Sequence, residues 1–325
     1  MASAIQAQDL VKEYRGNVRA LDGVSFEVET GQVFALLGPN GAGKTTTVKI
    51  LTTLSKPTSG TAKVEGIDVA RDPGAVRLAI GVVAQKAGVD PVGTGRENLH
   101  LQGRFYGLGG RSLTQRVSEL LELVDLTEAA DRPAGTYSGG MSRRLDIAIG
   151  LVHRPRVLFL DEPTTGLDPE VRAAMWDEIR RLALADGLTV LLTTHYLEEA
   201  DRLAGRIAIL DRGRVVTTGT PDELKAELRG DAITLELRDR AAEPEVRSAL
   251  SSLPGLGEIR VEDRSIHLRV DAGATALPGV LGAFDARGLT VASATVSRPS
   301  LDDVYLSHTG RSFAAADRIL EGAAR

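Results

Sequence analysis

The feature that most constrains the fold of this chain is a glycine-rich loop at residues 38–45. Its sequence, GPNGAGKT, fits the phosphate-loop pattern GxxxxGK[ST], and it lies between the apolar run Val33–Leu37 and a stretch of helical character. A strand, loop and helix in this order turn backbone N–H groups and a helix N-terminus toward phosphate oxygens. The pattern therefore predicts a nucleoside triphosphate site in an α/β domain. An ordinary glycine-rich turn is the competing interpretation.

Each position of the loop has an expected part in nucleotide binding. Lys44 is expected to reach the outer phosphates, and the hydroxyl of Thr45 is expected to ligate Mg²⁺. Backbone N–H groups of the turn are expected to surround the phosphates. The positions predicted to bind the nucleotide in this segment are Gly38, Pro39, Asn40, Gly41, Ala42, Gly43, Lys44, Thr45 and Thr46.

Composition argues against several other classes of protein. The 325 residues exceed one typical domain, so a large domain with a smaller one is expected. The formal net charge of -5 argues against a broad nucleic-acid-binding surface, and we expect no nucleic-acid partner. There is no cysteine and the five histidines lie far apart, so neither disulfides nor a zinc cluster is expected. The lack of cysteine also fits a reducing cytosol. No apolar run approaches the roughly 20 residues that span a bilayer, so we expect a soluble chain.

The order of apolar runs predicts how the sheet is built. Residues 4–37 read as an antiparallel segment that leads into the loop. Short apolar strands then alternate with helical runs, which is typical of a parallel sheet with helical crossovers. The predicted strands are residues 80–83, 157–160, 189–192 and 206–210. A helical subdomain is expected at about 94–153, punctuated by Gly103, Gly107, Gly109 and Gly110.

A second domain is predicted where the alternation of elements starts afresh. The order βαββαβ over residues 232–296 is typical of a small ferredoxin-like α/β fold, and Pro299–Asp303 then offers a helix cap. This accessory domain has no catalytic cluster and is expected to regulate or stabilise a dimer. The predicted division is a nucleotide-binding domain at 1–229, the accessory domain at 230–310, and a tail at 311–325 that is either helical or frayed.

A pair of acidic residues follows another apolar strand. Asp161 and Glu162 come directly after Val157–Leu160. Because the carboxyl ends of parallel strands share one edge of the sheet, this pair is expected beside the phosphate loop. There Asp161 can hold Mg²⁺, while Glu162 orients or deprotonates the attacking water. A solvated acidic turn, the alternative, does not account for the apolar residues directly before the pair.

A third motif carries a family resemblance. Residues 137–141 read YSGGM and begin a helical run shortly before the acidic pair. Together with the phosphate loop and the acidic pair, this motif resembles the ATP-binding-cassette (ABC) ATPases, over roughly residues 4–228. The resemblance implies that Ser138, Gly139 and Gly140 bind the γ-phosphate of an ATP molecule held by a second copy of the chain.

The same resemblance assigns further positions one by one. Tyr14 matches the aromatic residue that stacks on adenine. Gln85 matches the glutamine that touches Mg²⁺ and the γ-phosphate and relays their presence to a membrane partner. Asp168 matches the loop that crosses the dimer interface, and His195 matches the histidine that senses the γ-phosphate. These roles are implied by the family, since none of these residues would indicate a function alone.

Within the family, the chain is similar to the separate ATP-binding subunits of drug exporters of the daunorubicin-resistance type. The matching segments are residues 94–99 (TGRENL), 143–148 (RRLDIA) and 301–306 (LDDVYL). Tyr137 and Met141 depart from the leucine and glutamine that are usual in the signature. The resemblance implies a homodimer that sandwiches ATP with Mg²⁺ at the cytoplasmic side of the cell membrane. Hydrolysis would then drive a hydrophobic drug, antibiotic or lipid through transmembrane permease subunits on separate chains.

Two other functions stay open for a chain of this family. A soluble cassette protein that remodels a ribosome or DNA usually carries two cassettes or a long coiled-coil insertion, and the sequence contains neither. A subunit of a polysaccharide transporter or sugar importer typically carries an all-β C-terminal domain, whereas residues 231–297 read as mixed α/β. The exporter is therefore the favoured hypothesis.

Overall fold

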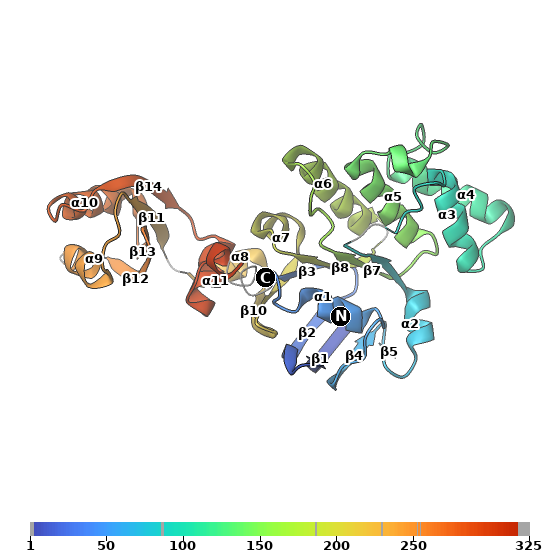
Figure 1. Ribbon diagram of the computed structural model, residues 1–325, viewed down its shortest axis with the longest axis horizontal. Helices are drawn as coiled ribbons and strands as arrows, with labels where there is room; N and C mark the ends of the chain where they lie inside the picture. The colour runs from blue at the N-terminus through green and yellow to red at the C-terminus, as the bar shows by residue number, and fades with distance from the viewer. Residues whose placement is uncertain are drawn as a thin grey trace. The chain divides into compact units, whose positions relative to one another are not determined.

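The computed structural model describes residues 3–85, 88–185, 187–228, 230–251, 253 and 255–317 (Figure 1). Over these positions the chain forms two compact units, one within residues 1–221 and 313–325 and the other within residues 222–312. In the part of the chain described, no helix combines the length and the apolar character needed to cross a membrane.

The first unit is built on a six-stranded sheet in the order β10-β9-β3-β8-β7-β6. The strands from β9 across to β6 are parallel, and β10 adds an antiparallel edge. The members are β3 (Val33–Leu37), β6 (Ile80–Val83), β7 (Val157–Asp161), β8 (Thr189–Thr194), β9 (Arg206–Asp211) and β10 (Arg214–Gly219). Strand β7 is buried at every position, which explains why its sequence is a continuous apolar run. The predicted parallel sheet is confirmed.

A four-stranded antiparallel sheet belongs to the same unit, in the order β2-β1-β4-β5. Its strands are β1 (Ser3–Tyr14), β2 (Val18–Glu29), β4 (Ser59–Val64) and β5 (Ile67–Asp68). Helix α1 (Lys44–Leu51) lies between the two sheets and contacts β2 and β4 as well as β7 and β8 (Figure 1). Side chains from both sheets and α1, among them Phe26, Phe34 and Ile50, share one core. This packing fixes the start of α1 against the parallel sheet.

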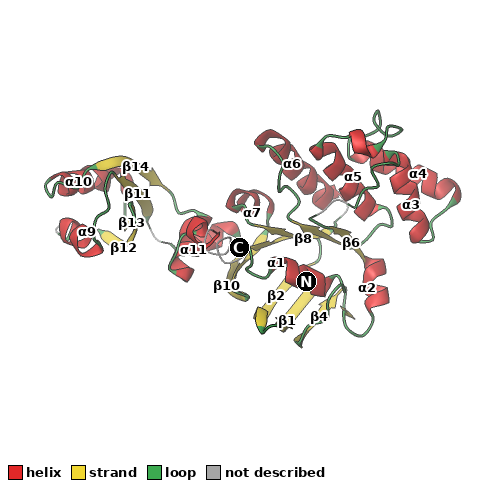
Figure 2. Cartoon of the chain, in the orientation of Figure 1, coloured by secondary structure: helices red, strands yellow, loops and turns green. Residues whose placement is uncertain are grey.

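Helices α5, α6 and α7 lie on the face of the six-stranded sheet opposite α1 (Figure 2). Between α1 and β9 the helices are α2 (Pro73–Ala79), α3 (Gly95–Phe105), α4 (Gly110–Leu123), the 3₁₀ turn η1 (Ala134–Thr136), α5 (Gly139–Leu151), α6 (Pro169–Ala185) and α7 (Leu197–Leu203). Residues 94–153 thus contain α3, α4 and α5. Helix α3 begins at a capping box, because the Thr94 hydroxyl accepts from the Glu97 N–H and the Glu97 carboxylate accepts from the Thr94 N–H.

Gly103 does not interrupt a helix, so that part of the sequence interpretation was wrong. It lies inside α3, and a Cβ at this position would lie 2.2 Å from Leu113 Cδ1 of α4. The Leu113 side chain packs so closely against residue 103 that only glycine fits there. The break comes later, at Gly107 with φ of 75° and Gly110 with φ of 59°, where glycine adopts the left-handed conformation without strain.

The second unit has the predicted βαββαβ order. Its elements are β11 (Asp231–Leu237), α9 (Glu243–Leu250), β12 (Leu256–Glu262), β13 (Ser265–Val270), α10 (Gly273–Asp285) and β14 (Val291–Ser297). The sheet order is β12-β13-β11-β14 with antiparallel pairs, which is the ferredoxin-like arrangement. Side chains of both helices, among them Val246 and Phe284, join the strands in a core that belongs to this unit alone.

Two short helices flank the second sheet in sequence. Helix α8 (Pro221–Ala226) precedes it, and α11 (Leu301–Thr309) follows it. The predicted cap of α11 is confirmed, because the Ser300 hydroxyl accepts from the Asp303 N–H while the Asp303 carboxylate accepts from the Ser300 N–H. Residues 313–317 are helical again and belong to the first unit, whereas residues 318–325 of the predicted tail lie outside the described residues.

Candidate nucleotide site

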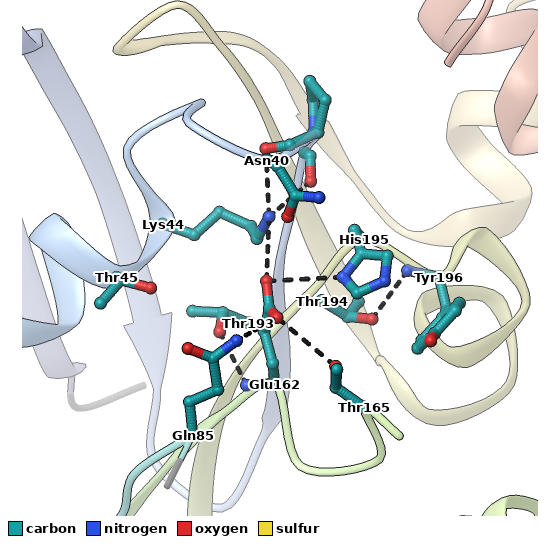
Figure 3. A network of polar contacts seen from close by, with 12 residues as sticks. Asn40, Lys44, Thr45, Gln85, Glu162, Thr165, Thr193, Thr194, His195 and Tyr196 are labelled. Carbon is teal, nitrogen blue, oxygen red and sulfur yellow. Dashed lines mark hydrogen bonds and ion pairs between the residues drawn. The ribbon is translucent and has the colours of Figure 1, made fainter. Parts of the chain in front are cut away.

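Loops that follow neighbouring strands meet at the carboxyl edge of the parallel sheet. The phosphate loop follows β3, Gln85 follows β6, the pair Asp161–Glu162 ends β7, and His195 follows β8. Since β3, β8, β7 and β6 are neighbours and run in parallel, their carboxyl ends bring these side chains together (Figure 3). The structure therefore brings Gln85, the acidic pair and His195 together beside the phosphate loop, although they lie far apart in the sequence.

The phosphate loop joins β3 to α1 through a backbone conformation that suits glycine. Gly43, the N-cap of α1, has φ of 111°, and a Cβ at this position would lie 2.7 Å from Leu21 Cδ2. No side chain caps α1, so the N–H groups of its first turn can donate to an anion. The loop thus has both the conformation and the donors that phosphate binding requires.

Lys44 is the principal cation of the site, and only 4% of it is exposed. Its Nζ donates to the carbonyl oxygens of Gly38 at 2.7 Å and Pro39 at 3.1 Å, and it lies 3.3 Å from Glu162 Oε1. Burial lowers the pKa of Lys44, while the neighbouring carboxylate of Glu162 opposes that effect. The ammonium group is therefore held over the loop that is predicted to take the phosphates.

Glu162 lies at the centre of the network (Figure 3). Besides the lysine, its carboxylate lies 3.4 Å from His195 Nδ1 and accepts hydrogen bonds from Gln85 Nε2 at 3.1 Å and Thr165 Oγ1 at 3.4 Å. Its φ of 51° is in the left-handed region, and the Thr193 hydroxyl accepts from its N–H at 3.0 Å. A non-glycine residue held in this region by surrounding contacts is typical of functional positions.

The charge of Glu162 follows from its partners. Burial by itself would raise the pKa of Glu162, but His195 and Lys44 outweigh burial and lower the pKa to about 2. The carboxylate is therefore ionised at neutral pH. Its basicity is low while Lys44 contacts it, so a phosphate that draws the ammonium group away would make Glu162 a stronger base.

Asp161 and Thr45 supply oxygen donors beside the phosphate loop. Thr45 Oγ1 lies 3.3 Å from Asp161 Oδ1, which also accepts a hydrogen bond from Thr193 Oγ1 at 2.6 Å. A carboxylate and a hydroxyl, with other positions left to water and phosphate oxygens, form a donor set that suits Mg²⁺. These residues fit the predicted metal. Gln85, the third predicted ligand, directs its amide nitrogen toward Glu162 instead.

The signature motif lies apart from the phosphate loop in the same unit. Ser138 caps α5 by accepting a hydrogen bond from the Met141 N–H at 3.2 Å, and both Ser138 and Gly139 are exposed. Gly140 is buried, and a Cβ there would lie 2.6 Å from Val171 Cγ1 of α6. Among the described residues, no hydrogen bond or ion pair joins this helix start to the phosphate loop. The contact of this motif with a second copy of the chain stays a prediction.

Asp168 and Tyr14 also stand outside the central network. Asp168 is exposed and accepts a hydrogen bond from the Val171 N–H at 2.9 Å, which caps the start of α6. Tyr14 ends β1 and is 41% exposed, with Lys12 Nζ 5.1 Å from the centre of its ring. The roles implied for these residues, at a dimer interface and against adenine, involve other molecules and stay predictions.

Tyr137 stands where leucine is usual in the signature, and its surroundings explain how it fits. Its Oη donates a hydrogen bond to the Ala129 carbonyl oxygen at 2.6 Å. A Cβ at residue 95 would lie 2.4 Å from the same Oη, so the tyrosine is accommodated because Gly95 has no side chain. The departure at 137 is therefore matched by the glycine at 95.

Arg143 is a buried positioning residue in the matching segment 143–148, to which the resemblance assigned no role. Its guanidinium donates to the carbonyl oxygens of Pro163 at 2.8 Å, Ala84 at 2.7 Å and Asp161 at 3.3 Å. It also donates to the Asp146 carboxylate at 3.1 Å. One side chain of the signature helix thus holds the loop of the acidic pair and the segment after β6. Its partners are mostly distant backbone carbonyls, which leave no pattern in the sequence.

We expect Arg143→Lys to lower ATP turnover about tenfold, since a lysine cannot reach all of these acceptors and small displacements at a reacting centre are costly. The affinity for ATP should change less than about twofold, because Arg143 does not contact the phosphate loop. The control is Arg144→Lys, whose side chain binds exposed Asp125. ATP turnover and ATP affinity are measured on the same preparation of each variant. An equal loss of turnover and affinity in Arg143→Lys would indicate a general structural defect.

Comparison with known proteins identifies the family of both units. The ABC transporter family matches residues 21–165, and the family described as ATP-binding protein DrrA1-3-like, C-terminal domain, matches residues 219–309. The daunorubicin resistance ATP-binding protein DrrA2 of Streptomyces coeruleorubidus is 49% identical over 94% of this chain and 95% of its own length. The daunorubicin/doxorubicin resistance ATP-binding protein DrrA of Streptomyces peucetius is 45% identical, over 99% and 96%.

Solved structures show the same core. The dimeric post-hydrolysis state of the ATP-binding cassette MJ0796, bound to ADP and Pi, has a TM-score of 0.61 at 27% identity and covers 66% of this chain and 98% of that one. The cbiO1 subunit of the Clostridium perfringens ABC transporter complex cbiONQ has a TM-score of 0.65 at 25% identity, covering 78% and 97%. Fold and site together define an ATP-hydrolysing cassette. The chain belongs to the ABC transporter ATP-binding family, with a DrrA-like C-terminal domain.

Proposed function

We propose that this chain is the ATP-hydrolysing subunit of an exporter that moves a hydrophobic drug, antibiotic or lipid out of the cell. The observation that supports this most is that the similarity to drug-resistance ATP-binding proteins runs through both units, at 42–49% identity over nearly the whole chain. A nucleotide-binding core alone would indicate only an ABC ATPase, because one fold serves many tasks. The match of the second unit to the DrrA1-3-like C-terminal domain favours the drug-resistance ATP-binding proteins among the ABC ATPases.

The compound would cross the membrane through permease subunits on separate chains, with this chain at the cytoplasmic face. Other relatives point in the same direction, among them the Nod factor export ATP-binding protein I of Cupriavidus metallidurans, 38% identical over 96% of this chain, and the linearmycin resistance ATP-binding protein LnrL of Bacillus subtilis, 35% identical over 94%. Their names refer to export or resistance. An import task therefore has less support.

We further propose that two copies of the chain enclose ATP between them. Ser138 and Gly139 are exposed at the N-terminus of a 13-residue helix, where the helix dipole and free N–H groups favour an anion. Gly139 lies beside Leu167, so the signature and the loop of Asp168 form one surface. The related cassette MJ0796 is described as dimeric. In this arrangement, Ser138 of one copy would face the phosphate loop of the other.

Within each site, the chain's own groups have separate tasks. Lys44 and the N–H groups of the loop bind the phosphates, and Asp161 with Thr45 would hold Mg²⁺, which when bound offsets negative charge on the phosphates. Glu162 accepts a proton from the attacking water, which Gln85 and His195 help to position. A phosphate that binds Lys44 would remove one cause of the lowered Glu162 pKa and so activate the base.

Drug retention in cells tests the export proposal. In the host of this chain with its own copy deleted, wild-type protein should lower the retention of doxorubicin several-fold, whereas Glu162→Gln should not, because turnover drives transport. Glu198→Gln, the same change at an exposed position of α7, serves as the control and should restore efflux. Retained drug is measured by its fluorescence. Equal retention in all of these strains would contradict export of this class of compound.

A further inference from the structure

The last residues that the structure describes, 313–317, contact the phosphate loop. Residues 313–317 form a helical turn within the first unit. Phe313 is 6% exposed and Ala316 is fully buried, so one face of the turn is anchored in the protein. On this turn, Asp317 Oδ1 accepts a hydrogen bond from the Asn40 N–H at 2.9 Å. Figure 3 shows Asn40 next to Lys44, above the carboxylate of Glu162.

In this contact the Asp317 carboxylate binds the phosphate loop as an anion would. Asn40 belongs to the glycine-rich turn whose N–H groups are expected to donate hydrogen bonds to phosphate oxygens. The carboxylate oxygen of Asp317 is a negatively charged acceptor like a phosphate oxygen, and it accepts a hydrogen bond from one of these N–H groups. Asp317 also adds a third carboxylate to the surroundings of Lys44, beside Glu162 and Asp161. When a triphosphate approaches the loop, the Asn40 N–H is therefore already bonded to Asp317, and the negative charge of Asp317 repels the phosphates.

We propose that residues 313–317 act as an autoinhibitory segment, in which the Asp317 carboxylate occupies the Asn40 donor and competes with a nucleotide phosphate for the loop. Binding of ATP then displaces the Asp317 side chain, and anything that holds the turn in place lowers the affinity for ATP. Because Phe313 and Ala316 anchor the turn, the carboxylate is delivered from a fixed position rather than from a free coil. In the sequence, residues 310–312 separate this segment from α11.

The inference depends on the nucleotide site, and affinity measurements on the full chain separate the two. The proteins compared are wild type, Asp317→Asn, Asp317→Ala and the control Asp285→Asn, which removes the same charge from an exposed position of α10. ATP with Mg²⁺ and adenosine are each measured by displacement of a fluorescent ATP analogue. Both Asp317 variants should bind ATP about five- to tenfold more tightly than wild type, the scale of one charge contact. Their affinity for adenosine should not change, because adenosine has no phosphate.

A second readout follows the segment itself. Hydrogen exchange of peptides that cover residues 313–317 should increase several-fold in the wild type when ATP binds, and should already be raised in Asp317→Ala without nucleotide. Affinities for ATP within twofold of wild type in both variants, with no change in exchange, would overturn the autoinhibitory role. Failure of every protein to bind ATP would overturn the nucleotide site and the inference with it.

Discussion

Glu162→Gln is expected to lower ATP turnover by about 10²- to 10⁴-fold, the usual contribution of a positioned general base. The amide has the shape of the carboxylate but cannot accept the proton of the attacking water. Binding of ATP should persist, because Lys44, the loop N–H groups and Asp161 are unchanged. Release of phosphate and binding of nucleotide, measured on the same preparation, distinguish these effects.

The control for this experiment is Glu198→Gln. This variant carries the same chemical change at an exposed position of α7, outside the network of contacts around Glu162. Its turnover should equal that of the wild type. A Glu162→Gln protein that hydrolyses ATP at a near-normal rate would show that another group activates the water. Loss of ATP binding in this variant would instead show that Glu162 mainly holds Lys44 in place.

Ser138→Arg is expected to abolish most turnover while each chain still binds ATP. The serine is exposed and lies apart from the phosphate loop of its own chain, so a bulky cation there leaves the first binding step intact. It would, however, block the contact of this signature with the nucleotide bound to the phosphate loop of a second copy. The matched control is Ser118→Arg on the exposed face of α4, which should behave as wild type. An equal loss of binding and turnover would argue against a role in trans.

Mixing the two inactive variants gives a sharper result. In a dimer of one Ser138→Arg chain and one Glu162→Gln chain, both defects fall in the same shared site, and the other site is intact. Turnover should therefore reappear on mixing, although neither protein is active alone. If signature and phosphate loop of one chain formed a site together, mixing would restore nothing.

The core and most of the nucleotide site could be predicted because each rests on a local pattern. Strand β7 is buried on both faces, so its position is plain from its apolar run, and the acidic pair marks its end. The phosphate loop is likewise contiguous, with glycine where φ is positive. Parallel strand order then places Gln85 and His195 beside it. Strands β4, β5 and β10 were not predicted, since exposed and half-buried positions give them no clear pattern.

Long-range contacts explain what the sequence did not reveal. Arg143 works through backbone carbonyls that any residue could supply, so the matching segment 143–148 does not reveal what its side chain contacts. Gly103 looked like a helix break because its partner, Leu113, lies on the next helix. Asp317 lies 277 positions from Asn40, and only the fold brings them together. In each case the information is in the packing of elements rather than in a local pattern.

The central claim is that two copies of the chain enclose ATP between them. It is tested most directly by measuring the molecular mass of Glu162→Gln in solution with ATP and Mg²⁺. The variant should run as a dimer when ATP is present and as a monomer when ATP is removed, because without hydrolysis the shared phosphates keep the two surfaces together. Wild type under the same conditions should be mainly monomeric as turnover separates the copies. A Glu162→Gln protein that binds ATP and stays monomeric would contradict the shared site.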